Sequence, residues 1–226
     1  DVVRAGNETV LRGRFADAAF FIQEDLKKPL ADYLPRLATL VFQTKLGSML
    51  DKTHRVEELV EDLLGMVPLK VEEAATLRRA AQLSKADLVT HMVVEMTSLQ
   101  GIMGRYYARH AGEPEEVAEA LFEYLLPRFP GDQMPKKPVA LLLGIADRVD
   151  SLVGLFAAGL APTGTKDPFA QRRTALGLIQ LLITWELSLD LRQVMAAAAR
   201  FQPIEVTEEH LAACLDFVVG RFQNLL

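Results

Sequence analysis

Apolar residues recur every three or four positions along most of the chain, which is the period of an amphipathic α-helix. The first apolar stripe runs from Leu11 to Leu26, and Pro29 and Pro35 mark its end. Further helices are predicted over about residues 37–50, 56–64 and 72–82. Strand-like alternation of apolar and polar residues is nearly absent, so the pattern favours an all-α fold.

The longest predicted helix covers about Lys85–Arg109, because its apolar residues share one helical face. A loop is predicted over residues 125–138, which contain four prolines and a glycine, and the strongly apolar stretch 139–156 predicts a central helix. After a turn at 161–165, Asp167 is predicted to cap a helix. Two more helices follow, the last beginning near Thr207 with Leu211, Leu215, Val218, Phe222 and Leu225 facing inward.

Composition limits the classes of protein. Half of the 226 residues are hydrophobic, which is enough to bury a large core and excludes wholesale disorder. The 25 Lys and Arg against 30 Asp and Glu give a net charge of −5, so nucleic acid would have to bind at a local basic patch. The single cysteine, Cys214, excludes an intramolecular disulfide and a zinc site made of thiolates, and we expect it in the core.

No apolar run reaches the 18 or so residues that a membrane span needs, and no basic-then-apolar leader opens the chain. We therefore expect no membrane partner. Because the chain starts at Asp1 and stops at Leu226 within an apolar helical pattern, we expect it to be a fragment of a longer protein.

Carboxylate and imidazole side chains recur along the predicted helix 85–109. Asp87, His91 and Glu95 are spaced by four, so one helix face could offer them to a divalent cation, with His54 and Asp147 completing the site. A helix-start cap at Asp87, with the other two residues in solvent, explains the same spacing without a metal and is favoured.

Two further patterns allow a chemical or a structural interpretation. Asp147 and Asp150 lie three apart in the apolar stretch and could act as an acid–base pair, but buried acids more often pair with arginines of neighbouring elements. Gly101 and Gly104 resemble a backbone clamp on nucleotides, although close packing within a helix is the better explanation. The structural interpretation is favoured in both cases.

Basic side chains gather at two places, the predicted helix junction near residues 45–55 and the turn and helix at 163–173. Lysines and arginines of this kind can neutralise backbone phosphates, whereas each one alone is more often a solvated or acid-paired surface residue. The candidate phosphate-binding residues are Lys45, Lys52, Arg55, Lys166, Arg172 and Arg173.

Several long runs, in order along nearly the whole chain, resemble the β subunit of bacterial and plastid-type glycyl-tRNA synthetase. The strongest are Ala146–Leu152 and Gly164–Arg173. Further runs that carry the resemblance are Phe15–Phe21, Leu34–Leu37, Phe42–Gly47, Ser84–Thr90, Gln100–Gly104 and Leu126–Phe129 followed by Gly131-Asp132.

The resemblance implies the middle of that subunit, an all-α, HD-domain-like helical bundle with flanking helices. Residues 1–45 would lead into the HD-like domain, 46–160 would form it, and 161–226 would lead towards an anticodon-binding domain absent from this chain. A phosphohydrolase of the HD superfamily has a lone His, an adjacent His-Asp pair and a distant Asp.

Set against that pattern, His54 can stand for the lone His and Asp147 for the distant Asp, but Ala86-Asp87 replaces the His-Asp pair. His91 lies one turn away and would need a different geometry. A metal site that lacks one of its direct ligands loses affinity and its activated water. We therefore expect no metal and no catalytic residue in this chain.

By resemblance, the family joins glycine to tRNAGly, with ATP and Mg²⁺ used on the α subunit or an α-like region and no cofactor bound here. The β part is implied to contact the acceptor side of tRNA through phosphates, first at residues 163–173 and second at 45–55. The expected partners are tRNAGly and the α subunit, with no DNA, in the cytoplasm or alternatively a plastid or mitochondrion. The alternatives are a metal-dependent HD-type phosphohydrolase using His54, Asp87, His91 and Asp147, and a helical subunit-docking scaffold.

Overall fold

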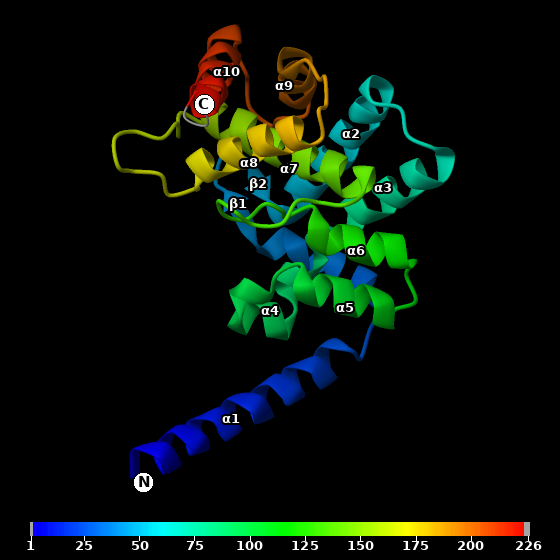
Figure 1. The fold of residues 1–226 in the computed structure, drawn as a ribbon, viewed down its shortest axis with the longest axis vertical. Helices are drawn as coiled ribbons and strands as arrows, with labels where there is room; N and C mark the ends of the chain where they lie inside the picture. The colour runs from blue at the N-terminus through cyan, green and yellow to red at the C-terminus, as the bar shows by residue number, and fades with distance from the viewer. Residues whose placement is uncertain (1, 224–226) are drawn as a thin grey trace.

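Helix α7 (Pro138–Ala157) runs through the centre of the computed structural model, which describes residues 2–223 (Figure 1). Pro138 lies in its first turn, where a missing N–H costs nothing. Almost every residue of the helix is buried, which removes apolar surface from water on all of its sides. The predicted central helix is confirmed.

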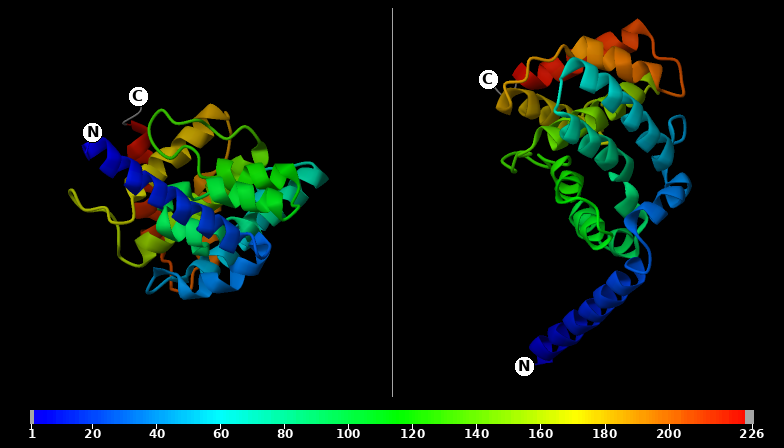
Figure 2. Two further views of the ribbon diagram at one scale, coloured as in Figure 1. Left: turned by 90° about the horizontal axis from the view of Figure 1, so that it is seen from below. Right: turned by 90° about the vertical axis from the view of Figure 1, so that its right-hand side faces the viewer.

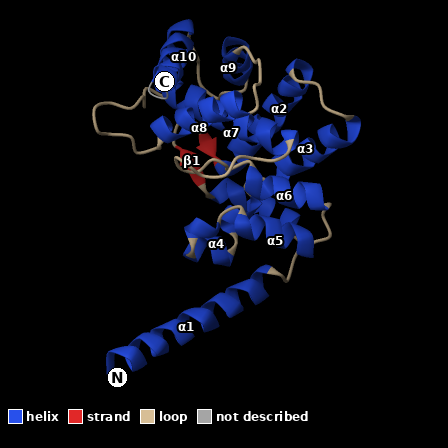
Figure 3. Ribbon diagram, viewed as in Figure 1, coloured by secondary structure: helices blue, strands red, loops and turns tan. Residues whose placement is uncertain are grey.

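The other elements are helices joined by loops, and the described part of the chain contains one small two-stranded sheet (Figure 3). The all-α prediction is therefore confirmed, as are the helix at 72–82, the loop after residue 125 and the turn at 161–165. Besides α7, the elements are α1 (Val2–Asp25), η1 (Leu30–Thr39), β1 (Val41–Gln43), β2 (Gly47–Ser48), α2 (Met49–Met66), α3 (Val71–Leu83), η2 (Ala86–Val89), α4 (His91–Glu95), η3 (Thr97–Leu99), α5 (Ile102–His110), α6 (Glu115–Glu123), α8 (Gln171–Thr184), α9 (Leu191–Arg200) and α10 (Glu208–Gln223), where η marks a 3₁₀-helix.

One main apolar core joins these helices, and α7 contacts α2, α3, α6, α8, α9 and α10. Helix α10 contributes Cys214 and Val218, both fully buried, so Cys214 is a core residue as predicted. Burial raises the pKa of the Cys214 thiol to about 12. Phe222 is partly exposed, contrary to the prediction that it faces inward, and Leu225 lies outside the described residues. Within residues 2–223, no helix is long and apolar enough to cross a membrane.

Helix α1 projects away from the rest of the molecule (Figures 1 and 2). The N-terminal part of its apolar stripe does not meet the core, since the exposed fraction is 55% at Leu11 and 72% at Phe15, whereas Ala18 and Leu26 pack against the core. The helix is attached near its C-terminal end, where buried Asp25 accepts hydrogen bonds from the backbone N–H of His91 (2.7 Å) and the hydroxyl of Tyr107 (2.8 Å). Burial raises the pKa of Asp25, but these and further hydrogen bonds outweigh burial and lower it.

The helix predicted over residues 37–50 is wrong, because this stretch contains a hairpin. Strand β1 pairs with β2 in antiparallel register, with Val41 opposite Ser48. Gly47 has a φ of +85°, which residues with a side chain rarely adopt. Ser48 then starts α2 with a capping box, in which its Oγ accepts from the Asp51 N–H and its N–H donates to the Asp51 carboxylate. Local turn chemistry thus starts α2 at Met49, earlier than the stripe indicated.

The single helix predicted over residues 85–109 is also wrong, since η2, α4, η3 and α5 divide it. Gly101, with a φ of +76°, stands at the last break. The carboxylate of Asp87 accepts hydrogen bonds from the N–H of Gly101 (2.6 Å) and Gly104 (3.1 Å), and thereby caps α5 from a distant element. A Cβ on Gly104 would lie 3.0 Å from this carboxylate, so the packing interpretation of the two glycines is confirmed although Gly101 is not within a helix.

Asp87→Asn should remove a pH dependence of stability. Burial raises the pKa of Asp87 to about 6, above its unfolded value near 3.8, despite the opposing hydrogen bonds from Gly101 and Gly104. The folded state therefore binds the proton more tightly, and the free energy of unfolding should rise as pH falls from 6 to 4, by about 2 kcal/mol. Urea unfolding at several pH values measures this slope.

Asp17→Asn, at an exposed carboxylate of α1, is the control and should keep the slope of the original chain. If Asp87→Asn and Asp17→Asn unfold with the same pH slope, Asp87 does not carry the proposed titration.

Candidate functional site

Two carboxylates of α7, Asp147 and Asp150, lie inside the molecule against three basic side chains. The Nζ of Lys52 on α2 lies 2.8 Å from Oδ2 of Asp150 and 3.1 Å from Oδ1 of Asp147. The Nε of Arg55 lies 2.7 Å from Oδ1 of Asp150, and the Nζ of Lys85 lies 2.7 Å from Oδ1 of Asp147. The expectation that these acids pair with neighbouring bases is confirmed, with two lysines and an arginine as partners.

We call Lys52, Arg55, Lys85, Asp147 and Asp150 the ionic cluster. Burial raises the pKa of both carboxyls, but attraction to Lys52, together with Lys85 at Asp147 and Arg55 at Asp150, outweighs burial and lowers both values. The cluster thus contains three cations and two ionised carboxylates. Groups so tightly paired are poor proton donors or acceptors at neutral pH, so an acid–base role for Asp147 and Asp150 has no support.

The residues expected to mark a former metal site do not converge. His54 points to solvent from α2, whereas Asp87 faces the start of α5 and His91 Nδ1 lies 2.9 Å from Asp25. What meets Asp147 instead is the ammonium groups of the ionic cluster. No group of three or more His, Cys, Asp or Glu within residues 2–223 is arranged to hold a metal ion. The donor set therefore does not fit the cation of an HD-type hydrolase.

The alignment of Asp87, His91 and Glu95 on one helix face is wrong as well. Asp87 belongs to η2, while His91 and Glu95 are the first and last residues of the short helix α4. The cap predicted at Asp87 exists in a different form, because the capped helix is α5 rather than the one that Asp87 was expected to start.

The structure separates the first cluster of candidate phosphate-binding residues. Lys52 and Arg55 are only 3% and 6% exposed and are held by Asp147 and Asp150. Their burial contradicts the prediction that these two residues contact phosphate. Lys45 is exposed, and its Nζ donates to the carbonyl of Ala158 (3.2 Å). The helical period of α2 explains the error, since positions 52 and 55 share the inner face of that helix with its apolar residues.

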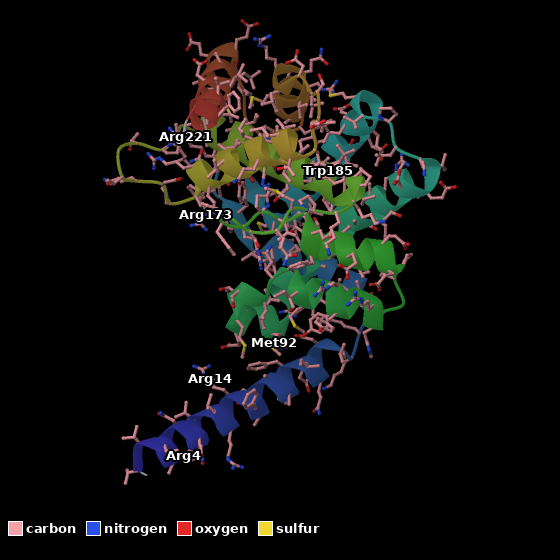
Figure 4. All side chains as sticks on the ribbon, viewed as in Figure 1. Arg4, Arg14, Met92, Arg173, Trp185 and Arg221 are labelled. Carbon is pink, nitrogen blue, oxygen red and sulfur yellow. The ribbon has the colours of Figure 1, made fainter. Side chains whose placement is uncertain are left out.

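The second cluster stays at the surface. Lys166 and Arg173 are exposed, and Arg172 is half-buried, with its Nη2 donating to the carbonyl of Gly164 (2.7 Å). The Asp167 carboxylate accepts from the N–H groups of Gln171 (2.8 Å) and Arg172 (2.9 Å), so it caps α8 from outside the helix, which begins at Gln171. Figure 4 shows Arg173 at the start of α8.

A cavity of about 170 Å³ lies next to the ionic cluster, and three distant segments line it. Sequence patterns missed two of its arginines, Arg128 and Arg148, because each stands alone in the sequence and only the fold brings them near Arg173. The lining residues are Tyr124, Leu125, Pro127, Arg128, Asp147, Arg148, Ser151, Arg173 and Thr174.

Lys85→Met should destabilise the protein strongly. The change leaves the Asp147 carboxylate with one of its two ammonium partners and removes the hydrogen bond from Lys85 to the Tyr124 hydroxyl (3.1 Å). Breaking a buried ion pair on one side costs about 3–5 kcal/mol, which urea unfolding measures. The double variant Lys85→Met/Asp147→Asn should recover part of this loss, because it also removes the uncompensated charge.

Lys137→Met, at an exposed lysine before α7, is the matched control and should change stability by no more than about 0.5 kcal/mol. Equal stability of Lys85→Met and the original chain would show that the ammonium group does not hold Asp147.

The amino-acid sequence matches a known family. A sequence model of the family described as "Glycyl-tRNA synthetase beta subunit" matches residues 1–226. The glycine–tRNA ligase beta subunits of Salmonella schwarzengrund (strain CVM19633) and Salmonella agona (strain SL483) are each 47% identical to this chain over 220 residues, which is 97% of this chain and 32% of each relative. This chain thus spans about a third of the length of these relatives, and it belongs to the glycyl-tRNA synthetase β-subunit family.

Proposed function

We propose that this chain is a tRNA-binding, non-catalytic helical part of the β subunit of glycine–tRNA ligase. The observation that carries the proposal is the exposed basic turn and helix start, formed by Lys166, Arg172 and Arg173. Phosphate contacts from such side chains supply affinity without reading the base sequence. The contacted region would be the acceptor side of tRNAGly.

The aminoacylation chemistry, with ATP and Mg²⁺, would take place on the α subunit. In this proposal residues 46–160 form an HD-like domain, flanked by 1–45 and 161–226, in which the ammonium groups of Lys52 and Lys85 take the place of a metal beside Asp147. A metal-dependent phosphohydrolase has no support from this arrangement, because ammonium groups lie against Asp147 and the side chains of Asp87 and His91 are engaged elsewhere. The proposed partners are tRNAGly and the α subunit in the cytoplasm.

Replacing the basic turn should weaken tRNA binding. The triple variant Lys166→Gln/Arg172→Gln/Arg173→Gln should lower the affinity for tRNAGly at least tenfold near 100 mM salt. It should also reduce the slope of log affinity against log salt by up to about 3, because fewer counterions are released from the RNA when fewer phosphate contacts form. Fluorescence anisotropy with labelled tRNAGly at several salt concentrations measures both.

A variant with the same change in charge tests whether position matters. Arg4→Gln/Arg12→Gln/Arg14→Gln removes three arginines from α1, two of which are labelled in Figure 4. This control should retain most of the affinity. Equal losses in both triple variants would mean that net charge, and not the turn at 163–173, governs binding.

The exposed apolar face of α1 supports a second candidate function, docking of another subunit. A helix in a protein gains most of its stability from packing of its apolar face. Leu11, Phe15 and Ile22 share one face of α1, and all three are exposed. We propose that the α subunit covers them.

Leu11→Asp/Phe15→Asp in the whole β subunit should therefore reduce the amount of α subunit retained in a pull-down at least fivefold. Charged groups at such a contact would have to be desolvated without a partner. The control Val71→Asp alters an apolar residue of α3 that is also exposed and should leave retention unchanged. Full retention by the double variant would argue against docking on α1.

A further inference from the structure

Basic side chains surround the cavity beside the ionic cluster. Asp147 lines it, but the Nζ atoms of Lys52 and Lys85 lie 3.1 and 2.7 Å from the Oδ1 of this carboxylate and offset its charge. Arg148 adds a buried guanidinium, which donates to backbone carbonyls and not to a carboxylate. The floor of the cavity thus favours an anion.

Hydrogen bonds to backbone carbonyls fix the side chain of Arg148, which forms one wall of the cavity. Its Nη1 donates to the carbonyls of Tyr124 (3.0 Å) and Gly144 (3.0 Å), and its Nη2 donates to three carbonyls of residues 125–127. A Cβ on Gly144 would lie 2.9 Å from the Nη1 of Arg148, so the helix leaves room for the guanidinium by having glycine there. With these donors occupied, Arg148 supplies charge and shape, and other side chains must contact a ligand.

Two arginines at the cavity have donors to spare. Arg173 is exposed and makes no ion pair or side-chain hydrogen bond with any of residues 2–223. Arg128 uses Nε and Nη2 on the Asp132 carboxylate (2.8 and 3.2 Å), which leaves its Nη1 without a partner in the described part of the chain. Guanidinium groups of this kind match the oxygens of a phosphate in charge and geometry.

An exposed aromatic ring stands next to Arg128. Phe129 is 53% exposed in the proline-containing loop, and the guanidinium carbon of Arg128 lies 5.6 Å from the centre of its ring. A basic cavity beside an exposed aromatic face is the combination that binds single-stranded nucleic acid, because the base of an unpaired nucleotide can stack on the ring. A base inside a duplex is already stacked and paired, so it cannot use Phe129.

We propose that this cavity binds a phosphate of an unpaired stretch of RNA, with an adjacent base stacked on Phe129; this inference rests on the proposed tRNA binding. Arg173 and the Nη1 of Arg128 contact the phosphate oxygens. At about 170 Å³, the cavity has room for one phosphate with part of its ribose but not for a duplex.

Binding of short RNAs to this chain tests the proposal. The probes are a fluorescein-labelled single-stranded hexanucleotide, a duplex of the same sequence, and labelled tRNAGly, all measured by anisotropy. The single strand should bind at least fivefold more tightly than the duplex. Phe129→Ala and Arg173→Gln should each weaken binding of the single strand at least fivefold, which is the low end of the effect of losing one stacked base.

Two control variants make the same kinds of substitution at positions away from the cavity. Phe20→Ala removes an exposed phenyl ring of α1, and Arg192→Gln removes an exposed arginine in the first turn of α9. Neither should alter binding. Circular dichroism of every variant should match that of the original chain, which shows that a loss of binding is not caused by unfolding.

Four outcomes would overturn the inference. Equal binding of single strand and duplex would remove the preference for unpaired RNA. Loss with Arg173→Gln but not Phe129→Ala, with full competition by inorganic phosphate, would indicate a free-phosphate site. Binding of tRNAGly that depends on Lys166 and Arg172 but not on Phe129 would reject this cavity while the proposed function stands, whereas absence of any tRNA binding would reject both.

Discussion

Pairing of Asp147 and Asp150 with three cations is the constraint on which the arrangement of the helices depends. The two carboxylates belong to α7, Lys52 and Arg55 belong to α2, and Lys85 precedes η2. Gln202, after α9, also donates to Oδ1 of Asp150 (2.9 Å). Any displacement of one of these elements would leave a charge buried without its partner, which costs several kcal/mol. The apolar core supplies most of the stability, and the ionic cluster fixes which faces of α2 and α7 meet.

The same cluster explains how a helical scaffold can resemble a hydrolase without its chemistry. A metal centre and an ammonium centre both neutralise a buried carboxylate, but an ammonium group offers no vacant position for a water or a phosphate ester. Under the proposed HD-like organisation, lysines replace the cation and keep the geometry of the core. In this proposal, ligands bind at the neighbouring cavity, where Arg128 and Arg173 remain accessible.

Elements with strong local signals were predictable from the sequence. The apolar run of α7 and the acidic start of α6 after Pro114 need only the neighbouring residues to be recognised. The breaks between residues 85 and 109 had no such signal, because Asp87 caps α5 through a contact 14 residues away. The apolar period continued across these breaks and concealed them.

The candidate site likewise combines features that the sequence could predict with features that only the fold creates. The exposed turn at 163–173 was predictable from glycine and proline, and its arginines from the sequence itself. Burial of Lys52 and Arg55 had a signal that was overlooked, since both fall on the apolar face of α2 with Leu59. The convergence of Arg128 and Arg148 with Arg173 had none, because it depends on how the loop after α6 packs against α7 and α8.

The state of Cys214 has a practical consequence. It is the only cysteine in the 226 residues, it is fully buried, and its pKa of about 12 keeps the nucleophilic thiolate scarce at neutral pH. A cysteine introduced at the surface would therefore react with a maleimide dye far faster than the native one. The chain is thus suited to labelling at two introduced surface cysteines without mutation of its own, which allows the direction of α1 to be followed by energy transfer between the two dyes.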